Sequence, residues 1–235
     1  MCKWTARTTI DKWNIKTIQA QVMVFSDDIV LIADNEKNLQ QAEYTYLGTV
    51  ISRNGKVDQE ISNRIKKANT IYYHICNTVI GKREIEKNVK VHIFKTLYLP
   101  TLLYESESWV PLDKHLSRVT AIEMRYLRRV AGRTRRDRIR NERTRQDVGT
   151  VSIKDTIEKR QLRWFGYLCQ MSEGRDPRKY SEARSTGKLP RGRPRIEWRD
   201  YISRVGEKRG KNWDAMRMLT RDREAWFAWT EAPPR

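Results

Sequence analysis

The sequence predicts a mainly α-helical protein with a small β part near its N-terminus. Between residues 57 and 229, apolar side chains recur every three or four positions, which is the spacing of one buried helix face. Upstream, residues 21–26 and 29–33 are short apolar runs with many β-branched side chains, as in strands. The chain of 235 residues is long enough to bury a core, and its eight Trp and ten Tyr argue against full disorder.

The β part is expected to begin with a hairpin. Asp27 and Asp28 stand between the two apolar runs, where a tight turn belongs. A short helix is expected over about 35–43. Residues 46–52 again resemble a strand, and the pair Asn54-Gly55 after them is a turn signal.

Helices are expected over most of the remaining chain. Gly81 and Gly132 are suited to end the first and the third of these helices. Residues 133–145 are basic with a single apolar anchor, so a helix and a solvated stretch both stay open. Six Gly and Pro residues within 172–195 indicate a linker. The expected helices cover residues 57–79, 85–97, 113–130, 153–168, 196–205 and 213–229.

The charge of the chain indicates a polyanionic partner. Lys and Arg number 48 against 29 Asp and Glu, a formal net charge of +19. Residues 1–60 have a net charge of −1, so the remaining 175 residues carry +20. We expect no membrane span, no signal peptide and no disulfide framework, because no long apolar run exists and the three cysteines lie far apart. These features favour an intracellular protein, nuclear or cytoplasmic.

The pair Asp27-Asp28 has two interpretations. On its own, the dipeptide favours a polar hairpin turn. Two adjacent carboxylates between apolar strands are also suited to a divalent metal, because hard cations prefer oxygen ligands. Polymerases use such carboxylates in a two-metal site that stabilises the attacking and the leaving oxygen.

The segment 24–33 resembles the palm signature of reverse transcriptases, in which an aromatic and a small residue precede two aspartates and an apolar strand. Phe25 and Ser26 occupy the aromatic and the small position. Further segments, in the same order, are similar to the C-terminal part of the endonuclease–reverse transcriptase of LINE-type (non-LTR) retrotransposons. Together the matches extend over residues 22–229. These further segments are residues 46–52, 99–109, 160–168, 192–195 and 221–226.

The resemblance implies a fragment of a palm hairpin followed by a thumb-like and C-terminal helical region. Asp27 and Asp28 would then be the catalytic pair that holds Mg²⁺ in the intact family, and RNA or DNA would be the partner. The oligomeric state stays open. The implied organisation is a palm remnant (1–52, with 1–21 unassigned), a thumb-like or connecting region (53–171), a basic linker (172–195) and C-terminal helices (196–235).

Departures from the family pattern predict that polymerase activity is lost. The strand with the other metal-binding aspartate, which the family places well upstream, has no match, and several dozen palm residues are missing between Gln40 and Tyr44. Tyr167 also stands where relatives often carry His. We therefore expect a truncated, internally deleted fragment in which Asp27 and Asp28 are vestigial, with no cofactor and no polymerase activity of its own.

Two basic runs are candidates for nucleic-acid contact. Residues 190–195, Pro-Arg-Gly-Arg-Pro-Arg, have the form of an AT-hook core, and the alternative is a charged flexible linker. Residues 133–140 are rich in Arg, which is suited to phosphate, and the alternative is a solvated helix whose acids pair with its arginines. The candidate binding residues are Arg133, Arg135, Arg136, Arg138, Arg140, Arg191, Arg193 and Arg195.

Three functional readings therefore remain. The first is a reverse-transcriptase-derived fragment that binds RNA or DNA by electrostatic attraction. The second is a residual RNA-directed DNA polymerase that uses Asp27 and Asp28 with two Mg²⁺ ions, and the third is an expressed relic without function. Five tryptophans could stack on bases, but their helical spacing favours core packing. These are Trp164, Trp198, Trp213, Trp226 and Trp229.

Overall fold

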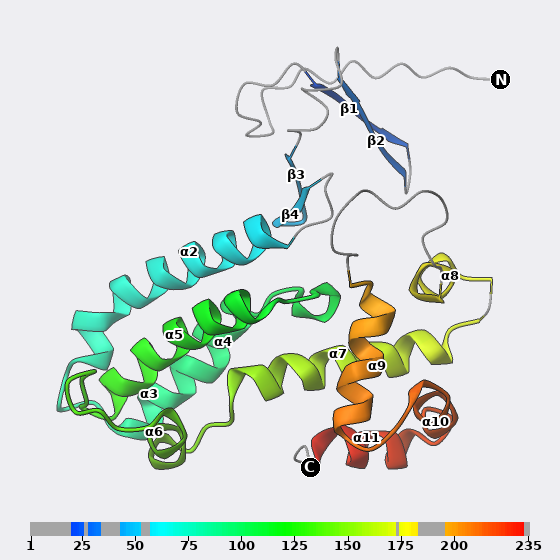
Figure 1. Cartoon of the computed structure of the whole chain (residues 1–235). Helices are drawn as coiled ribbons and strands as arrows, with labels where there is room; N and C mark the ends of the chain where they lie inside the picture. Colours follow the sequence, from blue (N-terminus) through cyan, green and yellow to red (C-terminus); the bar gives the residue numbers. More distant parts are fainter. Residues whose placement is uncertain are drawn as a thin grey trace. The chain divides into compact units, whose positions relative to one another are not determined.

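A computed structural model describes residues 20–25, 28–33, 43–52, 57–172, 174–182 and 196–232. The chain divides into two compact units, Met1–Asn63 and Arg64–Arg235. Figure 1 shows the helices and strands along the chain. The described part of the chain is mainly helical with a small β component, as the sequence predicts. No helix in these ranges is both long enough and apolar enough to cross a membrane.

The first predicted hairpin is present in the smaller unit. Strand β1, Ala20–Phe25, pairs antiparallel with β2, Asp28–Ala33. The register joins Ala20 to Ala33 and Phe25 to Asp28. Ser26 and Asp27 lie outside the described residues. The helix expected over 35–43 lies almost entirely outside them as well.

The single strand expected over 46–52 is wrong, because a tight turn divides this region. Strand β3, Glu43–Tyr46, pairs with β4, Thr49–Ser52, in a second two-stranded sheet. Leu47 and Gly48 connect them with φ angles of 47° and 84°, as in the hairpin turns that need positive φ at both central residues. The side chain of Glu60 accepts a hydrogen bond of 2.6 Å from the backbone N–H of Val50, which ties this hairpin to the following helix.

The helices agree with the predicted apolar faces. Ile61, Ala68 and Tyr72 are buried on α2, as their spacing requires. α2 continues into a π-helical turn, Cys76–Ile80, before Gly81, and a second π-helical turn, Phe94–Tyr98, joins α3 to α4. The helices are α2 Asp58–Ile75, α3 Lys87–Ile93, α4 Leu99–Leu102, α5 Asp113–Val130, α6 Asn141–Val148, α7 Ile153–Gln170, α8 Asp176–Glu182, α9 Trp198–Lys208, α10 Trp213–Leu219 and α11 Arg223–Glu231.

Helices α2 to α5 enclose an aromatic cluster in the larger unit. The rings of Tyr98 and Tyr126 lie 4.7 Å apart between centroids, and Phe94 lies 5.1 Å from Tyr126. Tyr72 of α2 completes the cluster at 6.2 Å from Tyr126. The buried hydroxyl of Tyr98 donates to the carbonyl of Ile122, and that of Tyr126 donates to the carbonyl of Lys90. Each buried hydroxyl therefore has a hydrogen-bond partner within the protein.

Helix α7 connects this cluster to the C-terminal helices. The side chain of Gln161, fully buried on α7, donates to the backbone carbonyls of Ser106 and Trp109 at 3.2 and 2.8 Å. The guanidinium of Arg160 donates to the carbonyl of Leu103 at 2.7 Å. Two of the segments that carry the sequence resemblance, 99–109 and 160–168, therefore pack directly against each other.

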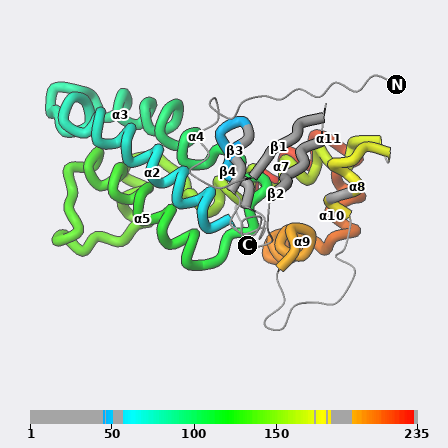
Figure 2. Tube along the Cα trace, turned by 90° about the horizontal axis from the view of Figure 1, so that it is seen from above, coloured from blue at the N-terminus to red at the C-terminus, as the bar shows by residue number. Residues whose placement is uncertain are grey.

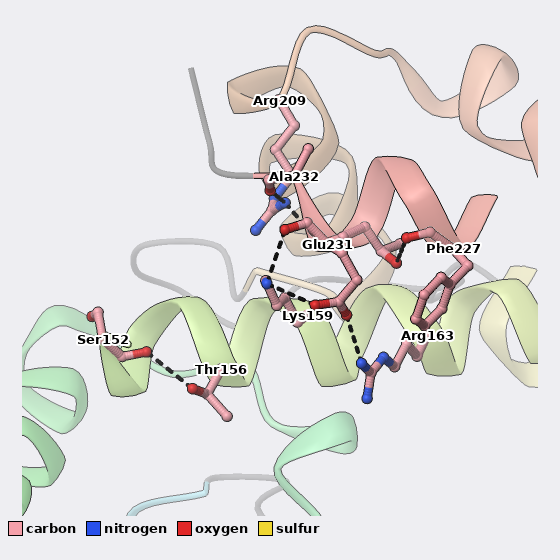
Figure 3. A network of polar contacts seen from close by, with 9 residues as sticks. Ser152, Thr156, Lys159, Arg163, Arg209, Phe227, Glu231 and Ala232 are labelled. Carbon is pink, nitrogen blue, oxygen red and sulfur yellow. Dashed lines mark hydrogen bonds and ion pairs between the residues drawn. The ribbon is translucent and has the colours of Figure 1, made fainter. Parts of the chain in front are cut away.

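The C-terminal core forms around α7, α9, α10 and α11. Its buried residues include Phe165, Ile202, Met216 and Trp226. Figure 3 shows how the last helix is held: Glu231 accepts from Lys159 at 2.9 Å and from Arg163 at 2.5 Å. These contacts anchor α11 on α7. Trp198, Trp213 and Trp229 pack against the same core, which confirms the core interpretation for four of the five tryptophans. Trp164 is half-buried beside Tyr167.

The helix limits differ from expectation at three places. Helix α8 occupies the first part of the stretch interpreted as a linker, and residues 183–195 lie outside the described residues. The helix expected over 213–229 is two helices, because the side chain of Asp222 accepts from the backbone N–H groups of Glu224 and Ala225 and starts α11 anew. Within 133–145, the helix begins only at Asn141.

Candidate nucleic-acid interface

The palm-like aspartates lie at the limit of the described residues, so their predicted role stays a prediction. Asp28 is the first residue of β2, and Asp27 lies outside the described ranges. Among the residues that the structure describes, no group of three or more His, Cys, Asp or Glu could hold a metal ion.

A broad basic groove lies on the larger unit, along α5 and the loop that follows it. It encloses about 900 Å³. Seven basic side chains and one acid, Asp113, line it, so its field is strongly positive. We call it the basic groove. Its basic residues are Arg125, Arg128, Arg129, Arg133, Arg135, Arg138 and Lys154.

The floor of the basic groove is a face of α5 with small side chains. This floor is formed by Ser117, Thr120 and Ala121, while the opposite face of α5 is buried in the core. In the next two turns of α5, the positive charges of the groove are the guanidinium groups of Arg125 and Arg128. The guanidinium of Arg128 donates to the side-chain oxygen of Asn141 at 2.6 Å, which fixes it against the start of α6. The small floor leaves room for a ligand beside guanidinium groups that the protein already orients.

The loop 131–140 begins where a glycine ends α5. Gly132 has a φ of 65°, a left-handed conformation that suits glycine. The N–H of Arg133 donates back to the carbonyl of Arg128 at 2.8 Å, and that of Gly132 to Arg129 at 3.2 Å. This is the Schellman arrangement. It turns the chain away from the helix axis at the position that the sequence predicts.

Asp137 shapes the rest of the loop. Its carboxylate accepts from the backbone N–H of Thr134 at 2.6 Å and from the Thr134 hydroxyl at 3.2 Å, which closes a turn. Arg135 and Arg136 lie within this turn and are exposed. Arg138 then adopts a left-handed φ of 51°, so no helix can run through this stretch. The helical alternative for the first part of 133–145 is therefore wrong.

The acidic side chains near the loop form ion pairs with Arg133 and Arg143, and not with the exposed arginines at 135–140. Asp147 forms ion pairs with Arg133 at 2.5 Å and with Arg143 at 3.5 Å. Asp137 is engaged with the backbone and hydroxyl of Thr134. Within the loop 131–140, four exposed guanidinium groups have no ion-pair partner among the described residues. These are Arg135, Arg136, Arg138 and Arg140.

A buried ion pair holds α6 against α5 behind the loop. Arg145 donates to the two carboxylate oxygens of Glu123 at 3.2 and 2.7 Å, and both side chains are almost fully buried. Glu142 lies 3.6 Å from the other nitrogen of Arg145. Burial raises the pKa of Glu123, although the hydrogen bond and the charge of Arg145 act against this rise. The ion pair therefore holds α6, which follows the loop, against α5, which precedes it.

Tyr72 forms part of the groove wall and stays neutral at physiological pH. Burial raises its pKa to about 12, with a hydrogen bond to Cys76 as the second cause. The guanidinium carbon of Arg125 lies 5.8 Å from the centre of the Tyr72 ring, within range of a cation–π interaction. The aromatic wall therefore adds no negative charge to the groove.

The structure brings together only part of the predicted binding set. Arg133, Arg135 and Arg138 line the basic groove, and Arg136 and Arg140 lie on the same loop. Arg191, Arg193 and Arg195 of the hook-like run lie outside the described residues. Four further basic groove residues escaped sequence analysis. Arg125, Arg128 and Arg129 could have been found from their shared helical face, whereas Lys154 on α7 has no local signal.

The chain is similar to an uncharacterized transposon-derived protein of Caenorhabditis elegans. The two sequences are 28% identical over 195 residues, which cover 79% of this chain and 69% of that relative. No protein-family model matches the chain. No solved structure matches it significantly.

Proposed function

We propose that this chain is a retrotransposon-derived protein that binds RNA or DNA electrostatically through the basic groove and the loop 131–140. The observation that supports it most is the unequal use of acids: Asp147 pairs with Arg133 and Arg143, while Arg135, Arg136, Arg138 and Arg140 face solvent without ion-pair partners in the described chain. Unpaired guanidinium groups beside a wide groove are suited to phosphate.

The transposon-derived relative supports the origin in this proposal. The LINE-type reverse-transcriptase ancestry is the finer part, and it rests on the ordered sequence segments from 22 to 229. The order of these segments is compatible with a chain that keeps the thumb-like and C-terminal helices of such an enzyme. In that ancestry, the retained helices would hold template RNA or target DNA beside an active site.

Salt-dependent binding tests the function. Fluorescence anisotropy with the full chain would measure the dissociation constant for RNA and DNA oligonucleotides at several salt concentrations. If about five phosphates are neutralised, log K should fall against log salt with a slope of about −4 to −5. Replacing the four unpaired loop arginines by Ala should make that slope less negative by about 3 and should weaken binding to all sequences.

A second variant of equal charge controls for the overall net charge. Arg175, Arg204, Arg221 and Arg223 are exposed and lie outside the basic groove. Replacing all four by Ala also removes four positive charges, but it should change the slope by less than about 1. Equal effects of the two variants would mean that binding follows net charge alone, and the groove proposal would then be wrong.

A further inference from the structure

An exposed tyrosine stands beside the basic groove. Tyr73 of α2 is 66% exposed, more than any other aromatic residue whose side chain the structure describes. Helices α2 and α5 lie side by side in both views (Figures 1 and 2), and Arg125 of α5 reaches across to α2. Its guanidinium donates to the side chain of Asn69 at 3.0 Å and to the Tyr73 hydroxyl at 3.5 Å.

Two contacts give the Tyr73 ring a defined position in spite of its exposure. The ring meets Tyr72 edge to face, with centroids 5.5 Å apart and planes at 72°. The hydroxyl contacts Arg125, which also lines the basic groove.

The surroundings of Tyr73 are free of acids on its own helix face. Lys66, Asn69 and Thr70 precede it at helical spacing, and Lys66 and Thr70 are exposed. Lys66 lies seven residues from Tyr73, about 10 Å along the helix axis. A cation at the hydroxyl of an exposed ring, and a second one on the same helix face, resemble the arrangement used for single strands, where bases stack on aromatic rings and arginine or lysine contacts the backbone.

We propose that Tyr73 stacks on an unpaired nucleobase, so that the basic groove prefers single-stranded over double-stranded nucleic acid. This inference rests on the proposed function, because the groove must first hold the backbone. Arg125 links the two parts: it orients the ring and lines the groove. A duplex keeps its bases stacked inside, so Tyr73 contributes nothing to duplex binding, whereas a single strand can unstack one base onto it.

The test compares ligands that differ only in their bases. The full chain would be titrated with single-stranded DNA, single-stranded RNA, a DNA strand with abasic sites throughout, and a duplex with the same number of phosphates. Tyr73→Leu should weaken binding to the base-containing strands about tenfold, and leave the abasic strand and the duplex unchanged. Tyr73→Phe keeps the ring and should bind as the wild type does. The RNA and DNA arms show which single strand binds more tightly.

Phe227→Leu is the matched control, because Phe227 is also an exposed aromatic residue, at 57%, on the distant helix α11. It should not affect binding. If Tyr73→Leu leaves binding to the base-containing strands unchanged, or weakens the abasic strand equally, the stacking inference is overturned while the groove proposal stands. If the loop-arginine variant binds all ligands as the wild type does, the groove proposal itself fails.

Discussion

The buried pair of Glu123 and Arg145 predicts a strong energetic coupling between α5 and α6. Glu123→Leu leaves the Arg145 charge in a site where its side chain is only 10% exposed. Arg145→Met leaves the carboxyl of Glu123, which is 1% exposed, without its bidentate partner. Removing one partner of a buried pair costs about 3–5 kcal/mol, because the remaining charge is uncompensated.

The double variant Glu123→Leu/Arg145→Met should recover most of this loss. Replacing a buried ion pair with apolar side chains of similar size is often close to neutral, because both desolvation penalties disappear together. The two single losses sum to about 6–10 kcal/mol, so a double variant that loses only about 1 kcal/mol gives a coupling energy of about 5–9 kcal/mol in the double-mutant cycle. For a chain of this size, each single variant should lower Tm by roughly 6–20 °C and the double variant by a few degrees.

Urea unfolding followed by far-UV circular dichroism would measure all four proteins of the cycle. A double variant whose loss of unfolding free energy equals the sum of the two single losses would refute the reasoning, since it would show two independent contacts. The cycle also bears on the loop, because α5 and α6 flank it. A double variant that keeps its stability and its oligonucleotide affinity would show that the pair contributes to binding only through the fold.

Three further predictions concern packing, pH and catalysis. Gly166→Ala should lower stability by about 1–3 kcal/mol, since the new Cβ would lie 2.3 Å from the indole nitrogen of Trp226, whereas Gly174→Ala meets no atom within 4 Å and should be neutral in thermal unfolding. Hydrogen bonds from Lys159 and Arg163 lower the pKa of Glu231. The stabilisation of the fold by this carboxylate is therefore complete above the unfolded pKa of about 4.3 and is lost as the pH falls through the pKa of the folded state. Glu231→Gln should therefore lower stability at pH 7 by about 0.5–1 kcal/mol, a difference that should vanish in acid, and an unchanged gap at low pH would contradict it. In primer extension with Mg²⁺ we expect no product from the full chain, and product that Asp28→Ala abolishes would show a residual polymerase.

The helical framework could be predicted because it depends on local patterns. The burial of Ile61, Ala68 and Tyr72 follows from three- and four-residue spacing alone. The end of α5 follows from Gly132, since few other residues adopt a left-handed conformation without cost. The β3–β4 turn could not be predicted in this way, because Leu47 takes a positive φ that its side chain disfavours.

The candidate site was only half predictable, because tertiary contacts define the rest. The arginine run at 133–140 is visible as composition, but which arginines stay unpaired depends on the ion pairs of Asp147 with Arg133 and Arg143. Lys154 joins the basic groove from the start of α7, which only the packing of α7 near α5 explains. Tyr73 follows directly after a buried core residue, and its exposure depends on how α5 packs against α2.

The basic groove and the palm-like hairpin belong to different units of the chain. Every residue that lines it belongs to the unit Arg64–Arg235, whereas Asp27 and Asp28 belong to the unit Met1–Asn63. The arginines that stabilise the larger unit, such as Arg145 and Arg209, are buried and bonded to the protein. The exposed loop arginines make no such contacts, so their loss would cost the fold little. Under the proposed function, these arginines would bind nucleic acid without any contribution from the aspartate pair of the hairpin.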